Sequence, residues 1–362
     1  YITIPLISVF SASFEVSLQK AALTGSVFSL FYALGCLIFG ALSDRFGRKA
    51  FLMIGICSIT IVTLLIGFVE SFYWLLILRA IQGAAASVYA PISLVYVGEV
   101  YPTDKRLTTI GFITSGFLTA AIFGQVLSSA IQELLGWPFI FFTLATLYFI
   151  SSLLVIFVLP REEPNSSGVR VWAIFKQMAV LLKNKQLLLT LFITFLSLFS
   201  LVAMYTILGS YLSTNTFGLS SQEILTVRAV GIFGILLAPF AGKLSNKYGI
   251  STVLRVGMVL ATAGVVMIGV FSNLILIVLM SVVFVAGIAL VCPVTISMVS
   301  ILGEKVRGTA VTFNAFILFV GASLGPVTAI FLMDVLTYTI SFLVLGVFLC
   351  IGLIVSMFIK VK

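Results

Sequence analysis

Apolar stretches of about 20 residues recur along almost the whole sequence, separated by short segments that contain charged residues, Pro, Asn or Gly. A helix of about 20 mainly apolar residues is long enough to cross the hydrocarbon core of a bilayer. Only 9% of the residues are charged, whereas about 25% are charged in ordinary soluble chains. The sequence therefore predicts an all-α integral membrane protein that is solvated mostly by lipid.

The ends of the apolar stretches predict complete transmembrane helices at residues 21–42, 50–69, 73–98, 107–131, 137–159, 187–213, 222–243, 251–271, 274–300, 307–330 and 335–359. The opening segment, residues 1–10, is apolar but too short to cross a bilayer. It lacks the basic start and the small-residue cleavage site of a secretory signal. We expect it to be the outer end of a twelfth helix, the first in order, whose beginning is missing from this chain.

The basic residues predict the orientation in the membrane. All Lys and Arg residues except Lys20, Arg79 and Arg228 fall in loops on one side of the predicted helices or at the C-terminal end. Basic loops stay on the cytoplasmic side of a membrane. We therefore expect a multi-pass protein of the cell membrane with both termini in the cytoplasm.

Several classes of function lack the residues that they require. The chain has no His, and its four Cys residues lie far apart inside apolar stretches, which excludes His-based catalysis and gives no spacing for a metal site or a disulfide framework. No phosphate-binding loop of the form G-x-x-x-x-G-K-(S/T) occurs. The basic residues do not gather on one helical face, as they do in nucleic-acid binders. We expect no metal, no cofactor, no nucleic-acid partner and no enzymatic activity.

The chain contains an internal repeat. An offset of 202 residues aligns GALSDRFG at 40–47 with GKLSNKYG at 242–249, and the longest polar interruption, residues 160–186, lies between the two copies. We predict a six-helix half at 1–159 with an incomplete first helix, a cytoplasmic linker at 160–186 and a second six-helix half at 187–362. Two parallel halves related by a pseudo-two-fold axis are an architecture of secondary transporters, which bind substrate near the midplane between the halves.

Two motifs in the first half resemble those of a known family. Residues 40–49, GALSDRFGRK, resemble the signature G-x-L-(A/S)-D-R-x-G-R-(K/R) of the major facilitator superfamily, and residues 79–86, RAIQGAAA, resemble its R-x-x-Q-G-x-x-A element. The resemblance covers the chain apart from the missing start of its first helix. It implies the major facilitator fold of twelve transmembrane helices in two six-helix bundles.

Within the superfamily, the chain looks most like proton-driven efflux proteins for drugs and other small molecules. It departs from their pattern in one place. Those antiporters usually carry a Gly-Pro pair in the fifth helix, where this chain has Gly124 and Gln125. The pair Gly325-Pro326 occurs instead in the 307–330 helix.

The first motif predicts a conformational lock on the cytoplasmic side. A glycine at its start allows close approach of a neighbouring helix, and a glycine in its turn allows a positive φ. The resemblance implies that Asp44 helps to hold the two halves together near the start of the 307–330 helix, whereas the second copy has Asn246 there. The predicted lock residues are Gly40, Asp44, Arg45, Gly47, Arg48, Lys49 and Glu99. The alternative for the basic residues among them is that they only set the topology.

Arg79 is the predicted coupling residue. It lies within the 73–98 helix, near the outer end, and a cation at membrane depth is unfavourable unless it is paired or faces water. Because Arg keeps its proton, it would act by tuning a carboxylate or by attracting an anionic substrate. The alternative is a side chain that snorkels to the membrane interface.

The other embedded polar residues either bond between helices or line a central cavity. We expect Arg228 to form an interfacial pair with Glu223, with a substrate contact as the alternative. The candidate cavity residues are Tyr32, Gln82, Tyr89, Tyr205 and Asn314. The candidate hinge residues are Gly83, Pro91, Pro293, Gly325 and Pro326.

Together these features predict a secondary transporter that works by alternating access and exports a small lipophilic or amphipathic compound in exchange for protons. Its partners would be that compound, protons and membrane lipid, and we expect a monomer. Transport of a polar metabolite such as a sugar or nucleoside is the alternative, but it would require more polar residues at the midplane than this chain offers. A non-transporting sensor or a channel fits the predicted lock less well.

Overall fold

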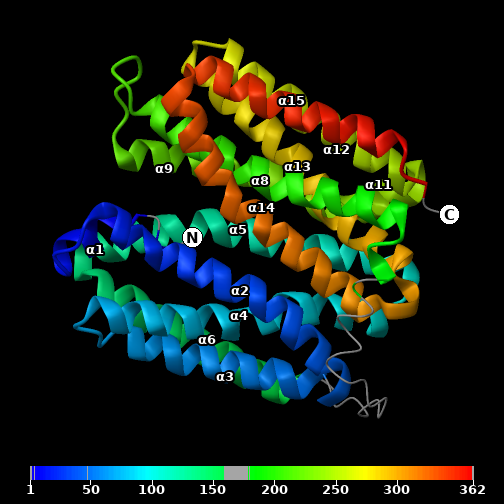
Figure 1. The fold of residues 1–362 in the computed structure, drawn as a ribbon, viewed down its shortest axis with the longest axis horizontal. Coiled ribbons are helices and arrows are strands. Elements are labelled where there is room, and N and C mark those ends of the chain that lie inside the picture. The colour runs from blue at the N-terminus through cyan, green and yellow to red at the C-terminus, as the bar shows by residue number, and fades with distance from the viewer. Residues whose placement is uncertain (1, 4, 47, 159–177, 179, 361–362) are drawn as a thin grey trace. The chain divides into compact units, whose positions relative to one another are not determined.

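The computed structural model describes residues 2–3, 5–46, 48–158, 178 and 180–360 (Figure 1). Within these ranges the regular structure is entirely helical, and no strand occurs. The predicted all-α class is therefore confirmed for the described part of the chain.

The chain divides into two compact units, and each is considered by itself. The first unit consists of Tyr1–Tyr96, Phe123–Met178 and Val311–Phe316. The second consists of Val97–Ile122, Ala179–Ala310 and Ile317–Lys362. Each unit contains most of one predicted half together with a helical segment from the other. Most of the linker at 160–186 lies outside the described residues, so the division into halves stays a prediction.

The helices that begin in the first predicted half follow the apolar stretches of the sequence. They are α1 (Ile7–Ser13), α2 (Leu18–Phe46), α3 (Arg48–Ile66), α4 (Phe72–Val100), α5 (Thr103–Leu135) and α6 (Trp137–Val158). Within the first unit α3 packs against α6, and α1 and α3 each pack against α2. The opening segment is held to the last part of α5, because the Ser128 hydroxyl donates to the carbonyl of Ile2 at 2.8 Å.

The second predicted half contains α8 (Lys185–Leu212), α9 (Ser221–Val230), α10 (Ile232–Ile235), η1 (Ala238–Phe240), α11 (Ala241–Tyr248), α12 (Ile250–Val270), α13 (Leu274–Leu302), η2 (Glu304–Val306), α14 (Arg307–Val335) and α15 (Tyr338–Met357). The span predicted at 222–243 as one helix is broken into four short elements. The breaks lie at Gly231 and around Pro239, where proline has no N–H to continue the helical hydrogen bonds.

Nine helical segments of the described residues are long and apolar enough to cross a membrane: Lys49–Ile66, Phe72–Leu94, Trp137–Phe157, Lys185–Leu212, Gln222–Tyr248, Ile250–Val270, Leu274–Leu302, Glu304–Val335 and Tyr338–Met357. The spans predicted at 21–42 and 107–131 are also helical, as α2 and α5. The apolar stretch of α2, Leu23–Phe39, is shorter than the other nine. The chain is therefore a multi-pass membrane protein, and the full number of spans stays a prediction.

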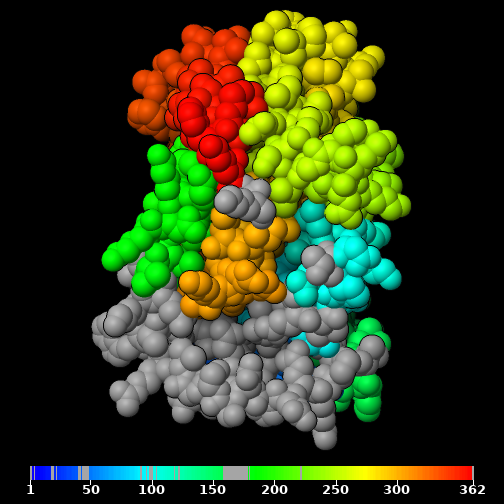
Figure 2. Space-filling model, turned by 90° about the vertical axis from the view of Figure 1, so that its right-hand side faces the viewer, coloured from blue at the N-terminus to red at the C-terminus, as the bar shows by residue number. Residues whose placement is uncertain are grey.

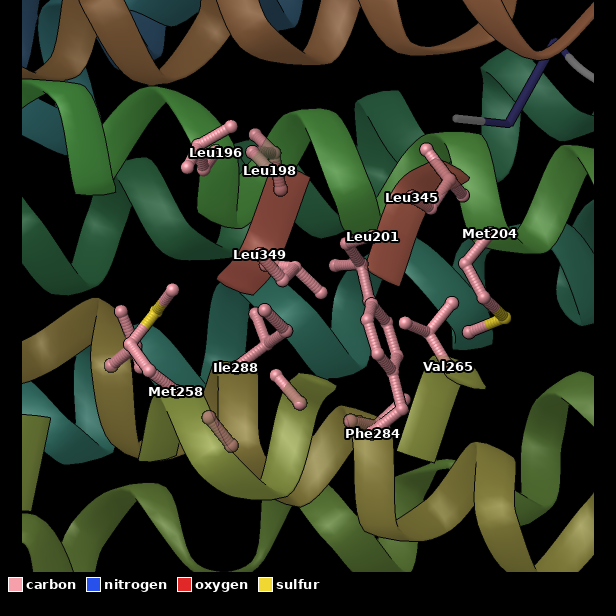
Figure 3. Packing of buried hydrophobic residues seen from close by; sticks show 14 of the residues in the cluster. Leu196, Leu198, Leu201, Met204, Met258, Val265, Phe284, Ile288, Leu345 and Leu349 are labelled. Carbon is pink, nitrogen blue, oxygen red and sulfur yellow. The ribbon is translucent and has the colours of Figure 1, made fainter. Parts of the chain in front are cut away.

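An apolar core holds the second unit together. It lies where α12 and α13 pack against each other and against α8 and α15. Figure 3 shows the ring of Phe284 from α13 pointing toward Leu201 of α8, with Val265 of α12 beside it. A Cβ atom at Gly264 would lie 2.6 Å from the backbone nitrogen of Phe284, so this glycine allows α12 and α13 to approach closely.

The beginning of α12 lies next to the C-terminal end of α15. The guanidinium of Arg255 donates from Nη2 to the carbonyl of Met357 at 3.5 Å. Figure 2 shows the last residues of the chain, in red, next to the yellow-green surface of the α11 and α12 region. Cations near helix C-termini interact favourably with the exposed carbonyl groups.

Candidate coupling site around Arg79

Arg79 of α4 is buried inside the first unit, with 2% of its surface exposed. Its Nε donates to the carbonyl of Thr24 at 3.1 Å, and its Nη1 donates to Oε1 of Gln82 at 2.5 Å. The central carbon of the guanidinium lies 4.4 Å from the ring centre of Phe28. This distance is within the range of a cation–π interaction. The charged group is thus held by a carbonyl, an amide and an aromatic face.

The α2 helix supplies two of these three contacts because Thr24 and Phe28 are four residues apart. Residues at this spacing lie on the same face of a helix, one turn apart. A close approach of α4 brings Arg79 to this face. A Cβ atom at Gly83 would lie 3.0 Å from the carbonyl carbon of Phe28 and 3.1 Å from its Cα, so the glycine after Gln82 permits the crossing of α2 and α4.

Gln82 links the guanidinium to α3. While Oε1 of Gln82 accepts from Arg79, Nε2 of the same amide donates to the hydroxyl of Thr63 at 2.7 Å. Thr63 is fully buried and Gln82 is 2% exposed. A continuous chain of hydrogen bonds therefore runs from α2 through Arg79 and Gln82 to α3.

The partners of Arg79 are electrically neutral. Among the described residues, no carboxylate contacts the guanidinium. Tyr148 of α6 lies close enough to interact with it electrostatically. In a low-dielectric interior a positive charge without a counter-ion produces a strong field, so the arrangement can attract an anion or favour the charged form of a nearby acid.

The interpretation of Arg79 as a snorkelling side chain does not fit this geometry. A snorkelling Arg keeps its charged head in the aqueous interface. Here the head is buried against α2 and α3.

Arg228 and Glu223 do not form the predicted pair. The carboxylate of Glu223 accepts from the backbone and the hydroxyl of Ser220, both at 2.8 Å, and so caps α9. Arg228 instead donates from Nη2 to the carbonyl of Tyr205 on α8 at 3.0 Å. Gly209 makes room for it, because a Cβ atom there would lie 2.6 Å from Nη2.

The candidate cavity residues differ in their exposure and in their hydrogen bonds. Tyr89 is 40% exposed, whereas Tyr32 and Asn314 are buried. The Tyr205 hydroxyl donates to the carbonyl of Arg228 at 3.5 Å, and this bond ties α8 to α9. Gln82 bonds to Arg79 and Thr63 through opposite ends of its amide. These bonds favour a role for Gln82 as a link between helices over a role in lining a cavity.

The structure describes the side chain of only one predicted lock residue, Lys49. Gly47 is not described, and for Gly40, Asp44, Arg45, Arg48 and Glu99 only the helical backbone is. Lys49 of α3 is described, and its Nζ donates to the carbonyl of Ile156 near the end of α6 at 3.1 Å.

The second copy of the signature shows how its first glycine is used. A Cβ atom at Gly242 of α11 would lie 2.7 Å from the backbone nitrogen of Thr108 and 3.0 Å from its Cα. Gly111, one turn further along α5, approaches the backbone of Ala238 and Pro239 in the same way. The first part of α5 and the η1–α11 segment therefore pack backbone against backbone within the second unit.

The candidate hinge residues lie in helices that continue past them. Pro293 and Pro326 are inside α13 and α14, and the described backbone of α4 is helical on both sides of Pro91. Gly325 packs against α8, because a Cβ atom there would lie 2.7 Å from the carbonyl oxygen of Phe199. Like Gly83, it serves close helix packing in this structure.

Three contacts of the site were not predicted: Thr24, Phe28 and Thr63. Nothing in the sequence separates them from the other Thr and Phe residues, because their role depends on which helices meet. Among the described residues, no group of three or more Cys, Asp or Glu side chains could hold a metal ion.

These features define a multi-pass α-helical membrane protein with a buried arginine. The family model of the Major Facilitator Superfamily matches residues 1–326 and 225–362, and the chain belongs to this superfamily. Its members are transporters rather than enzymes, in agreement with the prediction from the sequence.

Three relatives illustrate the similarity. The chain is 28% identical to the uncharacterized MFS-type transporter YybF of Bacillus subtilis over 73% of this chain and 66% of that protein. It is 27% identical to the multidrug resistance protein MdtG of Salmonella arizonae over 66% of this chain and 60% of that protein. It is 29% identical to a multi-drug resistance efflux pump PmrA homolog of Lactococcus lactis over 61% of this chain and 55% of that protein. The matched regions span less than two thirds of each of these three relatives.

Proposed function

We propose that the protein is a secondary transporter that exports a small lipophilic or amphipathic compound in exchange for protons. Arg79 would couple proton binding to substrate movement. The observation that carries this proposal is the burial of the Arg79 guanidinium against neutral groups only, within the described residues.

The physical argument starts from the cost of a membrane-embedded charge. Insertion of an Arg at the centre of a membrane helix is unfavourable by about 2.5–3.5 kcal/mol on translocon-based scales. A helix bundle can hold such a residue, but neutral partners do not cancel its charge. The remaining field lowers the free energy of any anion that comes near, whether a carboxylate of the transporter or an acidic group of the substrate. Protonation of such a group would change its attraction to Arg79.

The direction of transport and the type of substrate rest on the relatives. MdtG and the PmrA homolog are named for multidrug resistance and multidrug efflux. The composition agrees with apolar cargo, since 61% of the residues are hydrophobic and 13% are aromatic. A membrane potential supplies about 2.3 kcal/mol per elementary charge per 100 mV, which is enough to drive export against a gradient.

The signature loop would act as the cytoplasmic lock in this mechanism. Asp44 would hold the two halves together in one state and release them in the other. Lys49, which follows Asp44 in the signature loop, ties α3 to the last turn of α6. The concentration of basic residues in loops on one side favours a cytoplasmic location of both termini in the cell membrane. We propose that the protein works as a monomer.

A transport assay in everted membrane vesicles tests the proposal. In such vesicles export appears as uptake, and a panel of lipophilic dyes such as ethidium, together with sugars and nucleosides, covers the two substrate classes. We expect uptake of lipophilic compounds that a protonophore abolishes. Uptake that persists unchanged after the proton gradient collapses would rule out proton antiport, and uptake of the sugars alone would favour the polar class.

Variants of Arg79 test its role in the same vesicles. Lys carries the charge as a single point and cannot reproduce the forked contacts to Thr24 and Gln82. We therefore expect Arg79→Lys to reduce gradient-driven uptake by about tenfold or more. This factor corresponds to the loss of one charge-assisted hydrogen bond. Arg255→Lys is a matched control, because Arg255 lies near the beginning of α12 and its Nη2 makes an exposed hydrogen bond to Met357. Equal uptake by the two variants would show that Arg79 does not have the proposed coupling role.

A further inference from the structure

The Gln82 amide connects the guanidinium of Arg79 to the hydroxyl of Thr63. A guanidinium only donates hydrogen bonds, so it needs the oxygen end of the amide. In the structure Oε1 faces Arg79, and Nε2 faces the hydroxyl oxygen of Thr63 at 2.7 Å. If the amide were turned by half a rotation, two donor groups would meet at the guanidinium. The guanidinium therefore determines which end of Gln82 faces it, and the Thr63 hydroxyl on α3 accepts from the other end.

The second half of the chain shows that helix packing does not need this polar link. The offset of 202 residues places Val265 at the position of Thr63 and Phe284 at the position of Gln82. Val265 and Phe284 are both fully buried in the apolar core, and Figure 3 shows Val265 beside the ring of Phe284. The position of Arg79 is taken by Ser281, which is also fully buried. An apolar pair thus fills the corresponding place between α12 and α13.

We propose that Thr63 is a positioning residue for proton coupling, which acts on Arg79 through Gln82. This inference rests on the proposed coupling role of Arg79. The Thr63 hydroxyl anchors the Nε2 end of the amide, and the amide in turn holds the guanidinium on the Thr24–Phe28 face of α2. When the hydroxyl is removed, Nε2 of Gln82 loses this acceptor, so the amide is held less firmly and the hydrogen bond from Arg79 to Oε1 weakens.

Four variants separate this role from a structural one. Thr63→Val removes the hydroxyl and nearly keeps the shape of the side chain, whereas Thr63→Ser keeps the hydroxyl and removes a methyl group. Thr60→Val is the matched control, because Thr60 lies one turn earlier on α3 and its hydroxyl bonds only to Ile56 of its own helix, at 2.7 Å. The double variant Thr63→Val with Gln82→Phe reproduces the apolar pair of the second half.

The readout is a coupling ratio, measured on the full chain in everted vesicles. It is the initial uptake of a dye with the proton gradient in place, divided by the uptake after the gradient has been collapsed. The dye is the one from the panel that the unchanged protein moves fastest. Both rates are first corrected for uptake by vesicles that lack the transporter, so a general loss of folding lowers the two corrected rates together and leaves this ratio unchanged. The amount inserted is measured separately by immunoblot and by elution as a single species in detergent.

We expect Thr63→Val to lower the coupling ratio about tenfold, and Thr63→Ser and Thr60→Val to stay within about twofold of the unchanged protein. The double variant should insert and elute normally but show the same loss as Thr63→Val. A normal ratio in Thr63→Val, beside a reduced one in Arg79→Lys, would overturn the inference and leave the proposed function standing. A ratio near one in the unchanged protein would overturn the proposed function, and the role of Thr63 would fall with it.

Discussion

A single methyl group at Gly83 should separate the two helices that hold Arg79. In Gly83→Ala the new Cβ atom would lie 3.0 Å from the carbonyl carbon of Phe28 and still closer to its oxygen, whereas ordinary contacts begin at 3.4 Å. These are backbone atoms, so no side chain can rotate away. The α2 and α4 helices would have to move apart by roughly 1 Å to restore normal contact distances.

This separation would break the bond from Arg79 to α2. The Nε of Arg79 lies 3.1 Å from the carbonyl of Thr24, and a further shift of about 1 Å takes it beyond hydrogen-bonding distance. Loss of a hydrogen bond to a charged group costs about 1.5–3 kcal/mol, and strain from overpacking costs about 1–3 kcal/mol. The better helix propensity of Ala offsets about 1 kcal/mol. We therefore expect a net loss of about 1.5–5 kcal/mol in the free energy of unfolding.

Unfolding of the purified protein in detergent, by heat or by added SDS, measures this loss, and vesicle uptake measures its effect on transport. Gly116→Ala is the matched control, since Gly116 also lies in a helix and a Cβ atom there would meet nothing within 4 Å. It should leave the stability unchanged or raise it by up to about 1 kcal/mol. If Gly83→Ala were as stable and as active as Gly116→Ala, the close crossing of α2 and α4 would not be needed to hold Arg79.

Three further changes test other parts of the fold. Phe284→Ala should lower the free energy of unfolding by about 3 kcal/mol, because it leaves a cavity between α12 and α13, and a loss under 1 kcal/mol would argue against the tight core. Gly242→Val should push α11 away from Thr108 and reduce uptake with normal insertion, and normal uptake would show that this contact is dispensable. Asp44→Asn should also impair uptake without preventing insertion, as measured by vesicle transport and immunoblot, and normal transport would refute the proposed lock.

The helical elements could be predicted because membrane helices have a strong local signal. A span needs about 20 apolar residues, and the predicted span at 274–300 agrees with α13 at Leu274–Leu302 within two residues. The break in the 222–243 span was only partly readable. A proline such as Pro239 is a sequence signal for an interruption, but nothing distinguishes Gly231 from the other 28 of the 29 glycines of the chain.

Arg79 could be predicted as a site residue from the sequence, but the residues around it could not. Arg79 stood out because a cation in an apolar stretch is rare. Its partner Thr24 lies 55 residues before it, and Thr63, the partner of Gln82, lies 19 residues before Gln82. Only the crossing of the helices brings these residues together. The role of Glu223 was readable, since S-x-x-E at 220–223 is the pattern of a capping box. The cap holds Oε2 of Glu223 at the start of α9, whereas Arg228 bonds to the carbonyl of Tyr205.

The two halves of the repeat differ in where they place polar groups, and this difference bears on function. A buried Arg and a buried amide destabilise a membrane protein unless their hydrogen bonds are satisfied. Val265 and Phe284 occupy the corresponding positions without that cost, so the fold has an apolar solution for the same helix pair. The first half nevertheless carries Arg79, Gln82 and Thr63 in a connected chain of hydrogen bonds. Because packing can be achieved without them, these residues are open to the coupling role that we propose, and that role predicts a loss of coupling when the first half is given the apolar pair of the second.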